Sequence, residues 1–309
     1  MKKTKSMLKL FLFLLGVTAF SCSAPTASQN SSPHLYQRDD FKNYWYNGKA
    51  EINTYRLSQS RYGENSDGSA VLIFVSEDVS QKKQVKLDNP ASAGSDKVSV
   101  LKMNFTKNFV TGVYPYSMML SVFTPIERHI FPHTLKATFS SQEWCGQVFG
   151  QLNLKNKKYQ VQSNSYFESE GDQADQLNAV WLEDELWNLI RLDPGQLPVG
   201  EVTIIPGFFF TRLLHSPMKE QKATITSKKR NDQVEYSIQM PLLNRTLVIT
   251  YRLEFPHTIV GWEEHFIERG KPVSTKALLE KSIRLDYWNK NKNEFISLRD
   301  SLGLSRKNY

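Results

Sequence analysis

The chain has 309 residues, of which 40% are hydrophobic and 23% charged, and its formal net charge is +8. These proportions are typical of a globular protein with a sizeable core, and they exclude a disordered, fibrous or multi-span membrane protein. Aromatic residues make up 12% of the chain. Because runs of β-branched and aromatic residues outnumber helical patterns, the composition favours β-sheet.

The N-terminal segment has the pattern of a signal peptide. Four lysines and no acidic residue precede an apolar run of 11 residues, Leu10 to Phe20. A basic segment followed by a short apolar run is typical of secretory signals. At a helical rise of about 1.5 Å per residue, the run spans only about half of the hydrocarbon core of a bilayer. The sequence therefore predicts a cleaved signal peptide over residues 1–21 and no permanent transmembrane helix.

Cys22 directly follows this segment, with the small residues Ala19 and Ser21 before it. The arrangement resembles the lipobox of bacterial lipoproteins, in which the cysteine is acylated and the preceding peptide is removed. Phe20 is larger than the residue usual at its position, and an ordinary secretory signal is the alternative. We expect lipid attachment at Cys22, a flexible lipidated tether over residues 22–34, and a single β-rich domain over residues 35–309.

The residues after Cys22 include no acidic or lysine-rich cluster of the kind that resembles a surface-export signal. By that resemblance, we expect an outer membrane lipoprotein that faces the periplasm. Removal of the four N-terminal lysines halves the net charge of +8 to +4. The remaining basic runs, Lys155–Lys158 and Lys228–Arg230, lie in turn-like contexts typical of hairpin tips, so we expect no nucleic-acid partner.

Alternating apolar and polar residues predict most of the strands. Ala70 to Val75 is a continuous apolar run, which predicts a strand covered on both faces. Half-buried antiparallel strands are indicated by strict alternation in four further segments, which are residues 101–105, 236–240, 247–253 and 279–287. We expect a mainly β fold with about 12 or more strands, arranged as a large curved antiparallel sheet or half-barrel.

Two segments break the β pattern. Asp172 to Gly195 places Leu182, Leu186 and Ile190 on one helical face before Pro194, and this spacing predicts a helix. Residues 293–303 predict a second, shorter helix. We expect one or both of them to flank the sheet or to plug its concave side.

Cys145 and the histidines do not form a recognisable catalytic or metal-binding motif. The stretch around Cys145, QEWCGQVFG, contains no adjacent base, so we expect a small buried residue in a strand and not a nucleophile. His129 and His133 are four residues apart, as metal ligands on a helix would be, but Pro132 forbids that helix. The sequence therefore predicts no metal site.

Two charged groups have alternative interpretations. Arg212 and His215 could bind a carboxylate or phosphate, although a structural salt bridge is favoured. The acidic run from Glu168 to Asp175 lacks the spacing of a calcium loop, so loop solvation or charge at a helix N-terminus is favoured. The sequence contains no P-loop, no Gly-x-Ser-x-Gly motif and no Gly-x-Gly-x-x-Gly motif, and we expect no cofactor.

Four stretches carry a family resemblance, namely YWYNGKAEINTYRLSQSRYGE from Tyr44, YPYSMMLSVFTP from Tyr114, QEWCGQVFGQLN from Gln142 and YFESEGD from Tyr166. Together they look like an uncharacterised family of bacteroidete lipoproteins, over nearly the whole mature chain. Members are sometimes labelled "septum formation inhibitor Maf". That label implies a cytoplasmic α/β nucleotide pyrophosphatase, but the chain has neither its Ser-x-x-Arg-Arg type loop nor its fold pattern. The resemblance implies an envelope location and no activity.

Two functions remain open from the sequence. The first is a membrane-anchored, non-catalytic lipoprotein of the cell envelope that binds an apolar small molecule or an envelope protein. The second is an envelope hydrolase with a dispersed active site, which a cleft gathering Cys145, a histidine and an acid would support. The aromatic-rich segments motivate the first function and supply the candidate binding residues, which are Tyr114, Tyr116, Trp144, Phe208, Phe209 and Arg212.

Overall fold

The computed structural model describes residues 35–304, which include fifteen strands in one continuous sheet. The signal peptide, Cys22 and the tether lie outside the described residues. The strands are β1 Ala50–Arg61, β2 Glu64–Ser80, β3 Lys97–Thr111, β4 Tyr114–Pro125, β5 Lys136–Glu143, β6 Gly146–Lys155, β7 Lys158–Ser165, β8 Gln173–Asn178, β9 Trp181–Leu182, β10 Gly200–Ile205, β11 Gln221–Arg230, β12 Gln233–Met240, β13 Arg245–Arg252, β14 Ile259–Glu268 and β15 Lys271–Leu285. The α-helices are α1 Asp39–Trp45, α2 Glu183–Leu192, α3 Phe208–Leu213 and α4 Leu298–Ser301.

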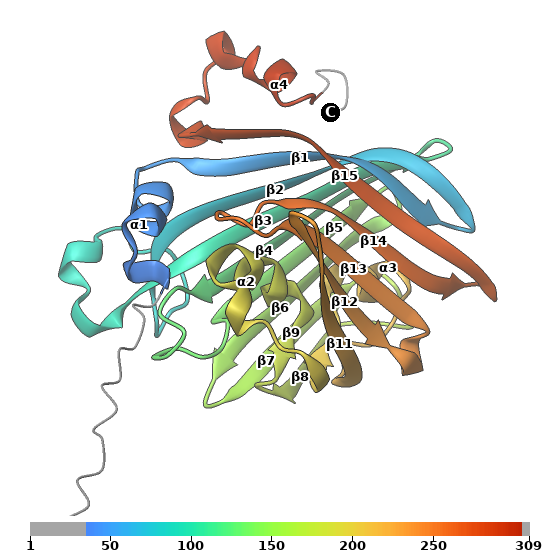
Figure 1. The fold of residues 1–309 in the computed structure, drawn as a ribbon. Coiled ribbons are helices and arrows are strands. Elements are labelled where there is room, and N and C mark those ends of the chain that lie inside the picture. The colour runs from blue at the N-terminus through green and yellow to red at the C-terminus, as the bar shows by residue number, and fades with distance from the viewer. Residues whose placement is uncertain (1–34, 305–309) are drawn as a thin grey trace, which may run out of the picture. The chain divides into compact units, whose positions relative to one another are not determined.

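The sheet is a long meander in which the last strand, β15, pairs with the first strand, β1, in the middle of the strand order. Strands β1 to β8 follow one another across one half of the sheet, β15 back to β9 form the other half, and β15 pairs with β1. The pairings are antiparallel except for the short contact between β9 and β10. Strand twist accumulates across a sheet this wide, so the sheet must curl. Figure 1 shows it curling around α2 and α3, which confirms the predicted curved antiparallel sheet with flanking helices.

The two basic runs lie at hairpin tips of the sheet, and Lys228–Arg230 are the last three residues of β11. Asn156 and Lys157 form the turn between β6 and β7 with φ of 51° and 60°, and Asn231, with φ of 54°, lies in the turn between β11 and β12. Asparagine tolerates positive φ better than most residues do. The predicted assignment of both runs to hairpin tips is confirmed.

Side-chain alternation decides which face of each strand is buried. In β3, Met103 and Phe105 are buried, whereas Lys102 and Asn104 between them are partly exposed. The same period of two appears in β12 and β13. Because successive side chains of a strand point to opposite faces, the apolar set of these three strands faces the interior of the curved sheet.

The strand around Ala70–Val75 is covered on both faces, as predicted. Leu72 is fully buried, while Val71 on the other face packs with Ile52 and with Leu302 near the C-terminus. Leu302 directly follows α4, which Figure 1 shows outside the sheet above β1. The predicted helix over residues 293–303 is confirmed only in part, because the structure has a 3-10 turn at residues 293–295 and then the four-residue α4.

The predicted helix from Asp172 to Gly195 is wrong over its first half. Residues 173–178 form the edge strand β8, the chain then crosses to β9, and the helix begins only at Glu183. The side chains of β8 are mostly exposed, so this segment has no apolar alternation that would indicate a strand. Pairing with β7 decides its conformation. Within residues 35–304, no helix combines the length and apolarity that crossing a membrane requires.

Helix α2 is buried around its whole circumference, between the two halves of the sheet. One side of the helix packs through Trp187, whose ring centroid lies 5.2 Å from that of Phe105 in β3 and 5.3 Å from that of Trp262 in β14. A helix in this position must bury its polar residues as well as its apolar ones. Each buried polar group then needs a partner from the sheet.

The sheet supplies those partners to the first turn of α2 from opposite sides. Glu183 accepts hydrogen bonds from Arg245 at the start of β13, one of them 2.7 Å long. Glu185 accepts from Arg128 at 3.1 Å and from the Thr134 hydroxyl at 2.7 Å, both in the loop between β4 and β5. These contacts fix the start of the helix between two distant parts of the chain.

Two further polar residues fix the rest of α2. The Asn188 amide donates to the Leu101 carbonyl at 3.0 Å and to the Thr124 hydroxyl at 2.9 Å. Arg191 forms an ion pair with Glu51 in β1, and both side chains are at most 1% exposed. Breaking such a buried pair on one side leaves an uncompensated charge, which costs several kcal/mol.

We therefore expect Arg191→Met to lower the free energy of unfolding by about 3–5 kcal/mol, because Glu51 keeps its buried charge without a cation. The double variant Arg191→Met/Glu51→Gln removes both charges, and we expect it to recover most of that loss. Urea unfolding of the three proteins measures the difference. A single variant within about 1 kcal/mol of the wild type would contradict this account of how α2 is held.

Candidate functional site

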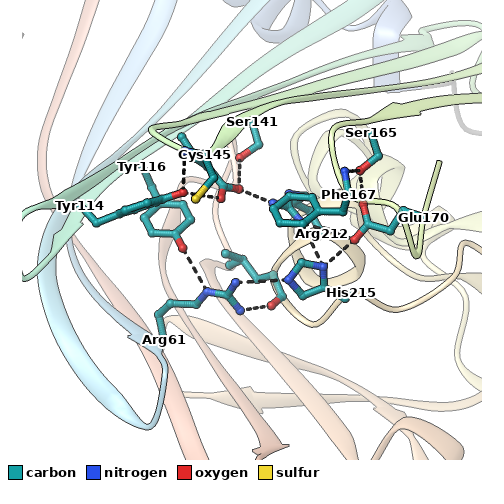
Figure 2. Close-up of polar contacts among 12 residues, drawn as sticks. Arg61, Tyr114, Tyr116, Ser141, Cys145, Ser165, Phe167, Glu170, Arg212 and His215 are labelled. Carbon is teal, nitrogen blue, oxygen red and sulfur yellow. Dashed lines mark hydrogen bonds and ion pairs between the residues drawn. The ribbon is translucent and has the colours of Figure 1, made fainter. Parts of the chain in front are cut away.

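A polar network lies where α3 meets the hairpin turns of β1 to β8, and Figure 2 shows it in close-up. Arg212 of α3 is its centre. Its Nη2 lies 2.5 Å from Glu143 Oε1 at the end of β5, and its Nη1 lies 3.5 Å from Glu170 Oε1 in the loop between β7 and β8. The side chains of Arg212 and Glu143 are 3% and 4% exposed. The favoured interpretation of Arg212 as part of a structural salt bridge is confirmed.

His215 joins the network just after α3. Its Nδ1 lies 2.5 Å from Glu170 Oε1, and its Nε2 lies 3.5 Å from Arg61 Nη2. Burial alone would raise the pKa of Glu170, but hydrogen bonds from Ser165 and His215 and the charge of Arg212 lower that pKa overall. An ionised Glu170 accepts a hydrogen bond from His215 Nδ1–H.

Arg61, at the end of β1, ties the same region to the centre of the sheet. Its guanidinium donates to the carbonyl of Leu213, the last residue of α3. Its Nε also lies 3.4 Å from the Tyr116 hydroxyl, and its Nη1 lies 3.8 Å from Glu268 at the end of β14. The C-terminal end of α3 is therefore held by β1, β5 and the loop between β7 and β8.

Tyr114 links the network to the turn that contains Cys145. The Tyr114 hydroxyl accepts a hydrogen bond from the Cys145 backbone N–H at 2.9 Å and lies 3.3 Å from Glu143 Oε2. Burial, together with the Cys145 side chain, raises the pKa of Tyr114 to about 12, although the hydrogen bond from the Cys145 backbone acts in the opposite direction. The phenol is therefore neutral at physiological pH and acts as a fixed hydrogen-bonding bridge.

The expectation that Cys145 is a buried strand residue is wrong. Trp144 and Cys145 form the two-residue turn between β5 and β6, and Cys145 is exposed. The neighbouring Trp144 suggested burial, but its side chain is itself 71% exposed. Gly146 lets the ring of Tyr166 pack closely beside this turn, because a Cβ there would lie 2.6 Å from that ring.

This arrangement does not form a thiol nucleophile with its base. Both ring nitrogens of His215 are occupied, by Glu170 and by the guanidinium groups of Arg61 and Arg212. A general base must lie within hydrogen-bond reach of the proton it removes, and the Cys145 backbone instead contacts Tyr114. No cluster of three or more potential metal ligands occurs within residues 35–304.

The structure brings together four of the six candidate binding residues. The Tyr114 ring lies 5.2 Å from that of Tyr116 and 6.4 Å from that of Trp144, and Tyr114 shares Glu143 with Arg212. The other two lie in the core. Phe208 stacks on Phe139 at 5.4 Å, and Phe209 packs edge to face against Phe105 at 4.8 Å.

The sequence does not point to Arg61 or Glu143 as members of the network. It also does not show that Glu170 pairs with Arg212 and His215. The sequence favours a salt bridge for Arg212, but its acidic partners lie about 40 and 70 residues away in the sequence. No local spacing connects them. Only the closeness of α3 to the β5 and β7 ends makes them partners.

Exposed aromatic side chains surround the network on neighbouring turns. Tyr62 follows β1, Trp144 follows β5 and Tyr166 follows β7, and they are 44%, 71% and 66% exposed. The Tyr62 hydroxyl lies 2.7 Å from that of Tyr116, and the Tyr166 ring lies against Gly146. We call the side chains of Tyr62, Trp144 and Tyr166, together with the half-buried Tyr114, the aromatic rim.

No protein-family model and no curated protein matches the chain. Among solved structures, it is similar to a beta-barrel-like protein of a domain of unknown function, DUF1849, from Brucella abortus, at 9% identity and a TM-score of 0.43, over 76% of this chain and 96% of that one. A second similarity is to immune modulator A of Aeromonas veronii, at 6% identity and a TM-score of 0.15, over 75% of this chain and 94% of that one. Likeness this distant carries no argument about function.

Because Cys145 is exposed on a turn, we expect a thiol reagent to modify it in the native protein nearly as fast as in urea. The isosteric variant Cys145→Ser is the control and should show no modification at this position. Mass spectrometry of the reaction over time measures both rates. Labelling that is at least about tenfold slower in the native protein would contradict the exposed turn and indicate a buried thiol.

Proposed function

We propose that the protein is a membrane-anchored lipoprotein of the cell envelope that binds its partner through the aromatic rim and performs no catalysis itself. The N-terminal pattern ending at Cys22 supports the anchor, since it resembles a lipobox. The outer membrane, with the domain facing the periplasm, is the proposed location. Its partner is an envelope protein or an apolar small molecule.

The exposure of Trp144 and Tyr166 carries the proposed binding role. Large aromatic side chains are expensive to leave in water, and they dominate the binding energy of protein interfaces together with arginine. Here they surround the buried Arg212, whose ion pairs hold the turns in place. The interior of the sheet is filled by α2 and α3, which favours binding at the rim over binding inside the sheet.

The hydrolase alternative would need a base next to the Cys145 thiol. His215 and Glu170 do lie in the same region, but His215 donates to Glu170 and faces two guanidinium groups. That arrangement favours a structural role for the histidine. A non-catalytic protein therefore accounts best for the geometry.

The anchor is tested by Cys22→Ala. We expect the variant to move from the membrane to the soluble fraction, because the acyl chains provide the stable attachment. Fractionation, combined with incorporation of a labelled fatty acid into wild type and variant, measures this. If both proteins fractionate alike and neither takes up label, the anchor is excluded.

The rim is tested by photo-crosslinking in the intact envelope. We expect Trp144→benzoylphenylalanine to give a discrete adduct, because an aromatic interface residue lies within contact distance of its partner. The matched control is Trp288→benzoylphenylalanine, since Trp288 is 42% exposed but lies in the C-terminal segment.

A protein-sized adduct at position 144 alone supports an envelope protein as the partner. A small mass increase at position 144 alone supports an apolar small molecule. Equal adducts at both positions, or none at position 144, would exclude the rim as the binding surface.

A further inference from the structure

A small cavity lies inside the curved sheet, away from the aromatic rim. It lies where the first turns of α2 and α3 face strands β3, β13 and β14, and its volume is about 20 Å³. That is room for one water-sized group. Its polar lining is charged and buried, and consists of Lys107, Glu183, Asp184, Arg245 and Glu264.

Lys107 is the unpaired member of this set. It projects from β3 and is 3% exposed, and its Nζ lies 4.6 Å from the ring centroid of Phe209 and 5.6 Å from that of Phe105. Across residues 35–304 no hydrogen bond or ion pair to this Nζ is formed. A buried amine without a hydrogen-bonding partner is costly and therefore calls for an explanation.

The surroundings of Lys107 favour its neutral form. Burial lowers the pKa of Lys107, and the charge of Arg245 lowers it further, although the carboxylates of Glu264, Glu183 and Asp184 act in the opposite direction. At a given pH, a larger fraction of this amine is neutral than of a surface lysine. The neutral amine is the nucleophilic form of lysine.

Asp184 supplies an acid to the same cavity. Arg245 pairs with Glu183 at 2.7 Å and with Glu264 at 2.6 Å, whereas Asp184 accepts only the backbone N–H of Phe208 at 3.2 Å. Burial, and then the charge of Glu183, raises the pKa of Asp184 to about 8. Asp184 therefore carries a proton at neutral pH, so an amine with a lowered pKa and a carboxylic acid line one cavity.

We propose that Lys107 is a covalent capture site for the smallest aldehydes, those of one carbon, which it binds as an imine inside this cavity. The Nζ lone pair attacks the carbonyl carbon, the C=O π pair moves to oxygen, and a proton passes from nitrogen to oxygen to give a carbinolamine. Asp184 then protonates the hydroxyl, which leaves as water while the C=N bond forms. The products are a protonated imine on Lys107, one water and the Asp184 carboxylate, so charge and atoms balance.

The size of the cavity sets the specificity. After water leaves, a one-carbon aldehyde has added a single carbon atom to Nζ, which matches a space of about 20 Å³. A larger aldehyde would have to displace the aromatic rings of Phe209 and Trp262, which line the same cavity. Displacing closely packed core side chains is strongly unfavourable.

The test incubates the purified full-length protein with formaldehyde at pH 6.5 and dilutes samples over time into guanidinium chloride with cyanoborohydride, which unfolds the protein and reduces each imine present to a stable methylamine. Peptide mass spectrometry compares the methylation rate of Lys107 with that of the exposed Lys229. We expect Lys107 to react several-fold faster, since its lowered pKa leaves a larger fraction of the amine neutral at this pH. Urea should abolish the difference. A native Lys107 that reacts no faster than Lys229 would overturn the proposal.

Two controls separate capture from general reactivity. Asp184→Asn is isosteric and removes the acid. We therefore expect Lys107 to be methylated several-fold more slowly in this variant, while the rate at Lys229 stays the same. An unchanged rate at Lys107 would overturn the role of Asp184. The second control needs no variant and replaces formaldehyde with benzaldehyde. We expect benzaldehyde to modify Lys229 and to spare Lys107. Modification of both lysines by benzaldehyde at equal rates would exclude the cavity as the site of reaction.

Discussion

The burial of α2 is the constraint on which the rest of the structure depends. A helix enclosed on all sides cannot expose its charged residues, and a buried charge is tolerated only when it is paired. Glu183, Glu185 and Arg191 therefore need partners, which come from β13, from the loop between β4 and β5, and from β1. The register of strands on both halves of the sheet must satisfy one ten-residue helix at the same time.

Helix α3 transmits this constraint to the surface. Its first residue donates a backbone hydrogen bond to Asp184 of α2. The preceding Gly207 permits the close approach, because a Cβ there would lie 2.6 Å from Glu183 Oε1. From its other end, Arg212 reaches Glu143 and Glu170. The buried cavity thus lies beside the start of α3, and the aromatic rim lies near its end. This short helix connects the site proposed inside the sheet with the binding surface proposed outside it.

The errors of the sequence interpretation have a common physical cause. Residues 173–178 form a strand although nearly all their side chains are exposed, because the backbone of β7 offers them hydrogen bonds. Cys145 is exposed although Trp144 precedes it, because a two-residue turn carries both side chains outward. In each case backbone pairing outweighs side-chain hydrophobicity, and a pattern of apolar residues carries no signal of it.

Hydrophobic periodicity by itself determined the class of this protein. Strict alternation in segments such as 101–105 and 236–240 is a local property, because side chains of a strand point to opposite faces, and it was sufficient to predict a wide, curved antiparallel sheet. Only the tertiary structure decided the site. Arg212 meets Glu143, and Lys107 shares a cavity with Asp184, and these residues lie about 70 residues or more apart in the chain. Contacts at such separation depend on how the sheet curls and where two helices fill it, and no local pattern encodes that geometry.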